Sequence, residues 1–239
     1  RPMLTLPIPM FGALVLAFLL VRLVVAERRV GPLAFLIGIC ALQSLVIALA
    51  QHYQVPGFRL VQPIGATVIP ATAWLAFTAS AIRPLRGSDV AHLLGPVVAG
   101  LALGVAPAML DLIIPALFLG YAVAMLLRLR AGMDALPQLR LEAGNLPVRI
   151  WVVIAVTLGL SAFSDVAILA AQSAGAAWLQ PVLISIFSAA NLLLIGGLSL
   201  TGGLRSEPEA EETPAPEASA EDAAIMERLG ALMAAQRPY

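Results

Sequence analysis

The chain has no lysine, a single cysteine and little charge of either sign. All fourteen basic residues are arginines, and only 12% of the 239 residues are charged. A retinal Schiff base needs a lysine, so the retinal-binding class of seven-helix proteins is excluded. With Cys40 as the only cysteine, neither an intrachain disulfide nor a cysteine-type metal site can form. We interpret Cys40, which lies in an apolar run, as a small packed hydrophobic residue.

The familiar signatures of catalytic and nucleotide sites are also missing. The sequence contains no P-loop, no HExxH metal motif, no GxSxG nucleophile motif and no glycine-rich dinucleotide turn. It shows no convincing internal repeat either, which argues against a transporter built from inverted repeats. We therefore expect no cofactor and no metal, and we do not expect an enzyme.

What the chain does have is apolar sequence. It is 60% hydrophobic with a mean hydropathy of +0.94, whereas soluble domains carry about 25% charged residues. A helix crosses a bilayer with about 20 apolar residues. The sequence predicts an all-α fold, a transmembrane bundle over 1–204 with seven helices near 7–26, 31–50, 61–82, 90–106, 108–127, 149–172 and 181–203.

Arginines alternate between the breaks that separate these segments. The breaks after the first, third and fifth segments carry eight arginines, whereas those after the second, fourth and sixth carry only Arg59. Because basic residues accumulate in cytoplasmic loops, this predicts an N-terminus outside and a C-terminus in the cytoplasm. We expect a multi-pass protein of a bacterial inner membrane, with membrane lipids as partners.

The C-terminal tail differs in composition from the bundle. Residues 1–205 hold twelve arginines against six acidic residues, whereas 206–239 hold two against eight. The stretch 205–222 is rich in Glu, Pro, Ala and Ser and predicts a disordered acidic linker. Residues 223–239 follow with an apolar stripe at helical spacing. This short amphipathic helix either begins a further cytoplasmic domain or packs on the membrane or on a second copy.

Polar side chains inside the apolar segments are the candidate site residues. Asp165 lies about 10 Å from the outer end of the sixth segment, and Gln43 lies about as deep in the second. Asp111 is one turn into the fifth segment, and Asn191 is near the middle of the seventh. Intramembrane ionisable residues are functional hypotheses by default. We expect these groups to converge on a ligand-binding cavity in the outer half of the bundle, with Gln43 and Asn191 near Asp165; the alternative is simple interhelical hydrogen bonding.

The outer loop QHYQVPGFRL adds three further candidates. His52, Tyr53 and Arg59 have the chemistry to recognise an anion or a peptide. Tyr53 is equally well explained as an anchor at the membrane interface. On the inner side, we interpret His92 as a solvated histidine without a metal partner.

Several stretches resemble the membrane half of bacterial AraC/XylS-type regulators. They are CALQSLVIALAQHY at 40–53, LVQPIGATVIPATAWLAF at 60–77, DLIIPALFLGYAVAML at 111–126, LSAFSDVAIL at 160–169 and the tail AIMERLGALMAAQRPY at 224–239. In that group a multi-helix membrane region precedes a cytoplasmic helix-turn-helix domain. The resemblance implies that such a domain follows Tyr239, that it alone contacts DNA, and that the protein acts as a homodimer.

The leading hypothesis is a sensory and anchoring domain. A periplasmic or lipid-borne small-molecule signal would bind the outer half of the bundle and shift helix packing or dimerisation. One alternative is an intramembrane enzyme that uses Asp111 and Asp165 as an acid–base pair. A small-solute transporter is the other alternative. A pair of carboxylates within hydrogen-bond reach would favour the enzyme. A continuous polar path would favour the transporter, and an outer pocket closed at its inner end would favour the sensor.

The arginine asymmetry generates a prediction about topology. Alkaline phosphatase is active only outside the cytoplasm, so its fusion after Gly203 should be inactive and its fusion within the 51–60 loop should be active. The measurement is phosphatase activity in intact cells, normalised to the amount of fusion protein. Strong activity of the Gly203 fusion would overturn the predicted orientation.

Overall fold

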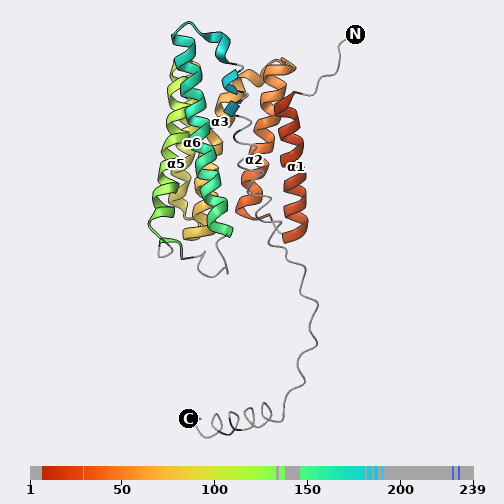
Figure 1. Ribbon diagram of the computed structural model, residues 1–239, viewed down its shortest axis with the longest axis vertical. Coiled ribbons are helices and arrows are strands. Elements are labelled where there is room, and N and C mark those ends of the chain that lie inside the picture. Colours follow the sequence, from red (N-terminus) through yellow and green to blue (C-terminus); the bar gives the residue numbers. More distant parts are fainter. Residues whose placement is uncertain are drawn as a thin grey trace. The chain divides into compact units, whose positions relative to one another are not determined.

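The computed structural model describes residues 7–28, 30–132, 135–137 and 146–180, and the positions 182–184, 186, 187, 190, 228 and 231. Within these residues the chain is helical and contains no strand. The main helices, shown in Figure 1, are α1 (Ile8–Glu27), α2 (Pro32–Ile47), α3 (Phe58–Phe77), α4 (Leu94–Val105), α5 (Leu110–Arg130) and α6 (Leu146–Ser173).

Short π and 3-10 elements lengthen these helices. The π-helical turns η1 (Ala48–His52) and η2 (Thr78–Ile82) continue α2 and α3, and the 3-10 elements η3 (Gly87–Leu93) and η4 (Pro107–Met109) lead into α4 and α5. In the described part of the chain, six helices are long and apolar enough to span a membrane: Ile8–Val25, Pro32–His52, Phe58–Ile82, Gly87–Val105, Pro107–Arg130 and Val148–Ser173. They match the first six predicted segments. The seventh, 181–203, lies almost wholly outside the described residues, as do the predicted linker and tail helix.

Prolines and left-handed residues set the helix boundaries. Pro32 occupies the first turn of α2, where its missing N–H would have no intrahelical partner anyway. Arg28 ends α1 with φ at 52°, and Gly57 precedes α3 with φ at 87°. Glycine adopts that conformation at little cost. The helix reversals are therefore encoded locally.

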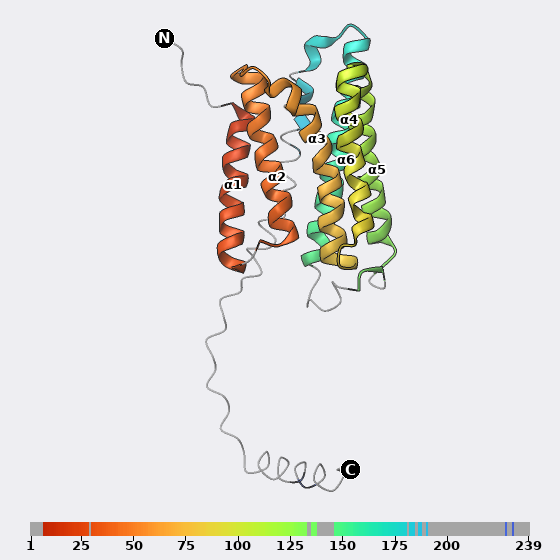
Figure 2. The ribbon, with the colours of Figure 1, turned by 180° about the vertical axis from the view of Figure 1, so that it is seen from behind.

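Helix α3 lies at the centre of the described bundle. It contacts α2, α4, α5 and α6, while α1 packs on α2. Figure 2 shows α4 beside α5 and α3 on the face opposite to that of Figure 1. Consecutive helices run antiparallel, so that one end of the bundle carries Arg28, Arg83, Arg86, Arg128, Arg130 and Arg149. We call this the arginine-rich end and the other the arginine-poor end.

The core is built from a few large side chains surrounded by alanines. Phe77, Met125, Ala73 and Ala155 are all fully buried, and Trp151 is 3% exposed. The Phe77 ring lies 5.4 Å from that of Trp151 and 6.0 Å from that of Trp74. In a bilayer the lipid is as apolar as the side chains, so helices associate through close packing, which small residues permit. The alanines therefore allow α3, α5 and α6 to approach closely.

An ion pair fastens the turn between α3 and α4 at the arginine-rich end. Arg83 donates two hydrogen bonds to the buried carboxylate of Asp89, at 2.8 and 2.9 Å. The backbone N–H of Arg86 donates a third, at 2.7 Å. Hydrogen bonding to Asp89 raises the pKa of the Arg83 guanidinium. A bidentate pair of an arginine with a carboxylate is the strong form of a salt bridge, and the third bond to Asp89 adds to it, so this turn is held in one geometry.

His92 is not the solvated residue that we expected. It is half-buried, and its Nδ1 lies 2.9 Å from the Tyr121 hydroxyl. Its ring lies 6.0 Å from that of Trp74. The contact joins η3 to the middle of α5, so Nδ1 of His92 has a hydrogen-bond partner within the bundle.

Replacing Phe77 should destabilise the bundle more than replacing a peripheral phenylalanine. Phe77→Ala removes the ring that contacts Trp74 and Trp151, and it should lower the free energy of unfolding by about 2–4 kcal/mol. This is near the lower end of values for soluble cores, because the side chain stays in lipid when the bundle unfolds. Phe11→Ala on α1, where the ring is 55% exposed, is the matched control and should cost less than about 1 kcal/mol. Both are measured by SDS-induced unfolding in mixed micelles. Equal losses for the two variants would contradict the assigned core.

Candidate functional site

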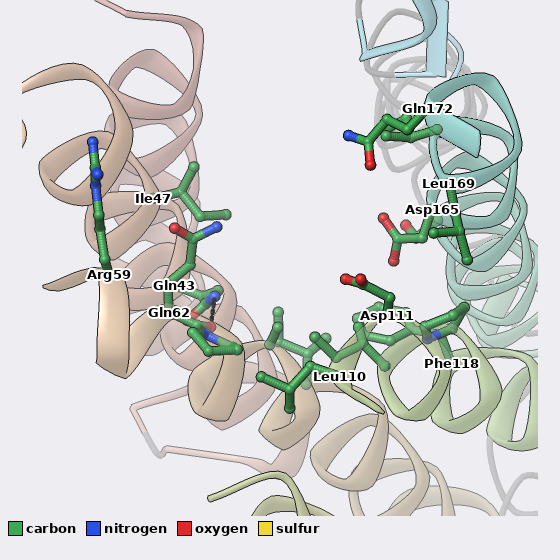
Figure 3. A pocket seen from close by; sticks show the side chains of 17 residues that line it. Gln43, Ile47, Arg59, Gln62, Leu110, Asp111, Phe118, Asp165, Leu169 and Gln172 are labelled. Carbon is green, nitrogen blue, oxygen red and sulfur yellow. Dashed lines mark hydrogen bonds between the residues drawn. The ribbon is translucent and has the colours of Figure 1, made fainter. Parts of the chain in front are cut away.

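A cavity of about 550 Å³ lies at the arginine-poor end of the described bundle. It lies among α2, α3, α5 and α6, and Figure 3 shows its walls. A cavity of this size is in the range of small-molecule sites. Its polar lining residues are Gln43, Arg59, Gln62, Asp111, Ser161, Asp165 and Gln172; the rest of its lining is apolar or proline.

One wall is acidic. Asp111 stands in the first turn of α5, and Asp165 stands on α6 about 12 Å from its C-terminal end by helix rise. Figure 3 shows both carboxylates pointing into the cavity and toward one another. Both side chains are accessible rather than sealed in the core. Among the described residues they form no hydrogen bond with each other, so the wall presents carboxylate oxygens to whatever occupies the cavity.

Two neighbours of Asp165 on α6 are already engaged. Ser161 donates to the backbone oxygen of Thr157 at 2.9 Å. Gln172 donates through Nε2 to Oε1 of Gln180 at 3.1 Å. These bonds fix the side chains that flank Asp165 on the same helical face. Asp165 is therefore the polar side chain of α6 that stays open to the cavity.

The opposite wall is formed by α2 and α3. Gln43, which is 5% exposed, donates from Nε2 to the backbone oxygen of Gln62 at 2.8 Å. This bond ties α2 to the first half of α3. Figure 3 places Gln43 and Gln62 across the cavity from Asp111 and Asp165, with Arg59 beyond them. Gln43 therefore faces Asp165 over the open space rather than pairing with it.

Prolines add backbone acceptors around the cavity. Pro63 and Pro70 lie inside α3, and Pro115 lies inside α5. A proline at one position deprives the carbonyl four residues earlier of its usual donor, which here affects Arg59, Ala66 and Asp111. All of these residues line the cavity. Irregular backbone is tolerated at membrane depth where it lines a cavity, which fits this clustering.

The cavity ends in packed apolar side chains on its way to the arginine-rich end. Along α6 the residues after Asp165 in that direction are Ala162, Leu158, Ala155 and Trp151, and each is at most 4% exposed. Along α5 the same direction leads from Asp111 to Phe118, Ala122 and Met125, which are also buried. Along α5 and α6 the polar lining of the cavity therefore gives way to buried apolar side chains.

The structure brings most of the predicted site residues together, but not all of them. Gln43, Arg59, Asp111 and Asp165 line the cavity. His52 and Tyr53 do not line it; both are exposed, and their rings pack edge to face at 5.0 Å. Asn191 lies outside the described residues. That the cavity binds a ligand stays a prediction.

Gln62 and Pro63 line the cavity as well, and the sequence analysis did not single them out. Gln62 is a polar amide beside a proline within the predicted third helix. Polar residues next to a proline inside an apolar helix were the available signal, because both features are tolerated together only where the backbone faces protein or water. The described residues contain no group of three or more His, Cys, Asp or Glu side chains that could hold a metal ion.

Comparison with known proteins gives no relative. No family model, no curated protein and no solved structure matches the chain. The resemblance to AraC/XylS-type regulators therefore stays a prediction.

The close contact of Gly65 with Gln43 generates a prediction. A methyl group at position 65 would overlap the side-chain oxygen of Gln43, so Gly65→Ala should displace Gln43 from Gln62 and destabilise the bundle by about 1–3 kcal/mol. Gly120→Ala on α5 is the control, because no atom lies within 4 Å of its added methyl; it should be neutral or stabilise by up to about 1 kcal/mol. In a Gln43→Ala background, Gly65→Ala should cost little. An undiminished cost in that background would refute the proposed clash.

Proposed function

We propose that this chain is the membrane-embedded sensory and anchoring domain of an AraC-type transcriptional regulator. The six long apolar helices support insertion in a membrane, and the arginine asymmetry supports a cytoplasmic arginine-rich end. The cavity then opens in the periplasmic half of the bundle. A helix-turn-helix domain beyond residue 239 would carry the DNA contact, as the sequence resemblance implies, with a homodimer matching two half-sites.

The blind end of the cavity is the observation that carries this proposal. A transporter needs a polar route past its binding site, and the described helices put Phe77, Met125 and Trp151 in that position. A sensor needs a cavity that a ligand enters and leaves from one side, joined to helices that reach the opposite face. Helices α3, α5 and α6 provide that connection, because each lines the cavity and continues into the core.

The lining points to a polar signal that donates hydrogen bonds or carries positive charge. Asp111 and Asp165 offer carboxylate oxygens, and the prolines leave carbonyls without their usual donors. Hydrogen bonds that involve a charged group contribute about 1.5–3 kcal/mol each. A ligand that bridged the acidic wall to the side-chain oxygen of Gln43 would draw α5 and α6 toward α2 and α3.

Signalling then follows from differential affinity. A ligand shifts a conformational equilibrium only as far as it binds one state better than the other, and coupling free energies of about 1–3 kcal/mol are typical. Closing the two walls on a ligand would tilt α5 and α6 against α3 about the alanine-rich core. The cytoplasmic ends would move with them and alter the spacing of the DNA-binding domains.

An intramembrane enzyme is the second candidate, and one observation favours it. Asp111 and Asp165 face one another in the cavity, and two close carboxylates can divide the roles of acid and base. An enzyme requires both carboxylates for turnover of a substrate. A sensor requires them only for affinity or for the response, so that excess ligand restores the response of a single variant.

Asp165→Asn should insert normally and change signalling. The substitution keeps the side-chain shape and lowers the cost of burial in the membrane, but it removes a charged acceptor and should weaken the response to the signal about tenfold or more. The measurement is expression of a reporter gene under the regulator, in cells carrying the intact gene, across growth media and external pH. Ser173→Ala, which loses only a bond to its own helix, is the control. A reporter response identical to wild type in every condition would leave Asp165 a structural residue.

A further inference from the structure

A second hollow lies at the arginine-rich end, between the start of α2 and the end of α3. It is a groove of about 340 Å³, separate from the cavity described above. Its lining from α3 and η2 includes Thr72, Ala76 and Ala79, which repeat at helical spacing on one face. Gly31 and Pro32 complete it from the start of α2. The small α3 residues and Gly31 leave a channel where larger side chains would have filled the space.

Large apolar side chains flank this channel. Val30 is 70% exposed, Phe35 58% and Leu85 52%, and all of them line the groove. Exposed apolar side chains are expected on membrane-spanning helices and beside them, because this surface faces the hydrocarbon of the bilayer. An apolar groove lined by small residues and flanked by exposed large ones fits a single flexible hydrocarbon chain.

Basic residues adjoin the groove at the membrane surface. Arg28 precedes the lining residue Val30 by two positions, and Arg86 follows the lining residue Leu85 directly. The charge of Arg83 is engaged by Asp89. Asp89 accepts a hydrogen bond from the backbone N–H of Arg86, not from its side chain. Among the described residues, neither Arg28 nor Arg86 forms a salt bridge. Their guanidinium groups are therefore not neutralised within this part of the chain.

We propose that this groove binds an anionic phospholipid of the leaflet on the arginine-rich side. One acyl chain lies along Ala76 and Ala79, and the phosphate lies within reach of Arg28 and Arg86. Basic pockets between transmembrane helices on the cytoplasmic side are suited to anionic headgroups. The proposal rests on the membrane insertion stated under the proposed function, and it is independent of the outer cavity and of any signal.

The experiment counts bound lipid on the full chain. The protein is purified in a neutral detergent and titrated with phosphatidylglycerol or with phosphatidylcholine of the same acyl chains, and bound lipid is measured by native mass spectrometry. We expect one phosphatidylglycerol to bind at least about tenfold more tightly than phosphatidylcholine, since each basic residue near the surface is worth about fivefold. The preference should shrink at high salt, because salt screens exposed charges.

Matched double variants assign the site. Arg28→Ala with Arg86→Ala should abolish the preference for phosphatidylglycerol, whereas Arg28→Lys with Arg86→Lys should keep most of it. Arg128→Ala with Arg130→Ala removes the same charge from the end of α5, away from the groove, and should leave the preference intact. Ala79→Phe, which fills the channel, should weaken both lipids together. Glycerol phosphate, which has the headgroup charge without acyl chains, should not compete.

The opposite results have distinct meanings. Equal binding of the two lipids, or equal loss of preference in the two alanine pairs, would overturn the proposed lipid site while leaving the sensory proposal untouched. Competition by glycerol phosphate would overturn the acyl-chain part and indicate a free phosphate site. A chain that dimerises through Phe35 and Leu85 instead of binding lipid would also overturn it. A chain that stays soluble without detergent would remove membrane insertion and both proposals.

Discussion

Close packing of α5 against α6 and α3 holds this part of the described bundle together. The contact depends on alanines, among them Ala73, Ala122 and Ala155, which are at most 1% exposed. In a membrane, burial of apolar area gives little driving force because lipid is equally apolar, so stability comes from dispersion between closely approaching helices and from polar bonds. Phe77 and Trp151 fill the space that remains. Every other feature of the structure is placed by this frame, including both walls of the cavity.

The cavity exists because the same helices depart from close packing at the arginine-poor end. Pro63 and Pro115 interrupt the backbone bonds of α3 and α5 there, and polar side chains replace alanines. Carbonyls without donors are costly in hydrocarbon, so they are sustainable only beside polar groups, water or a ligand. A polar, proline-lined cavity above an alanine-packed core is therefore one design: the core fixes the geometry, and the cavity is left to respond to what enters it.

The two ends of the bundle are built for different surroundings. At the arginine-rich end, Asp89 accepts three hydrogen bonds from Arg83 and the Arg86 N–H, and His92 is paired with Tyr121. At the other end, Asp111 and Asp165 lie open in the cavity. Hydrogen-bonded polar groups hold one arrangement, whereas open ones change their energy with their occupant. Under the proposed function, a signal would act on the open carboxylates while the bonded groups keep the turn at the opposite end in one geometry.

The sequence by itself determined the six described helices, because length, hydropathy and proline positions are local properties. It also indicated which polar residues lie at similar depth, since helix rise converts sequence position into depth. It could not decide which of them meet. Helices α1, α2, α5 and α6 are apolar on all sides, so no stripe marks a buried face. Only the tertiary structure paired Gln43 with Gln62 rather than with Asp165, joined His92 to Tyr121 and set Asp111 opposite Asp165, because rotation about each helix axis is fixed by packing with its neighbours.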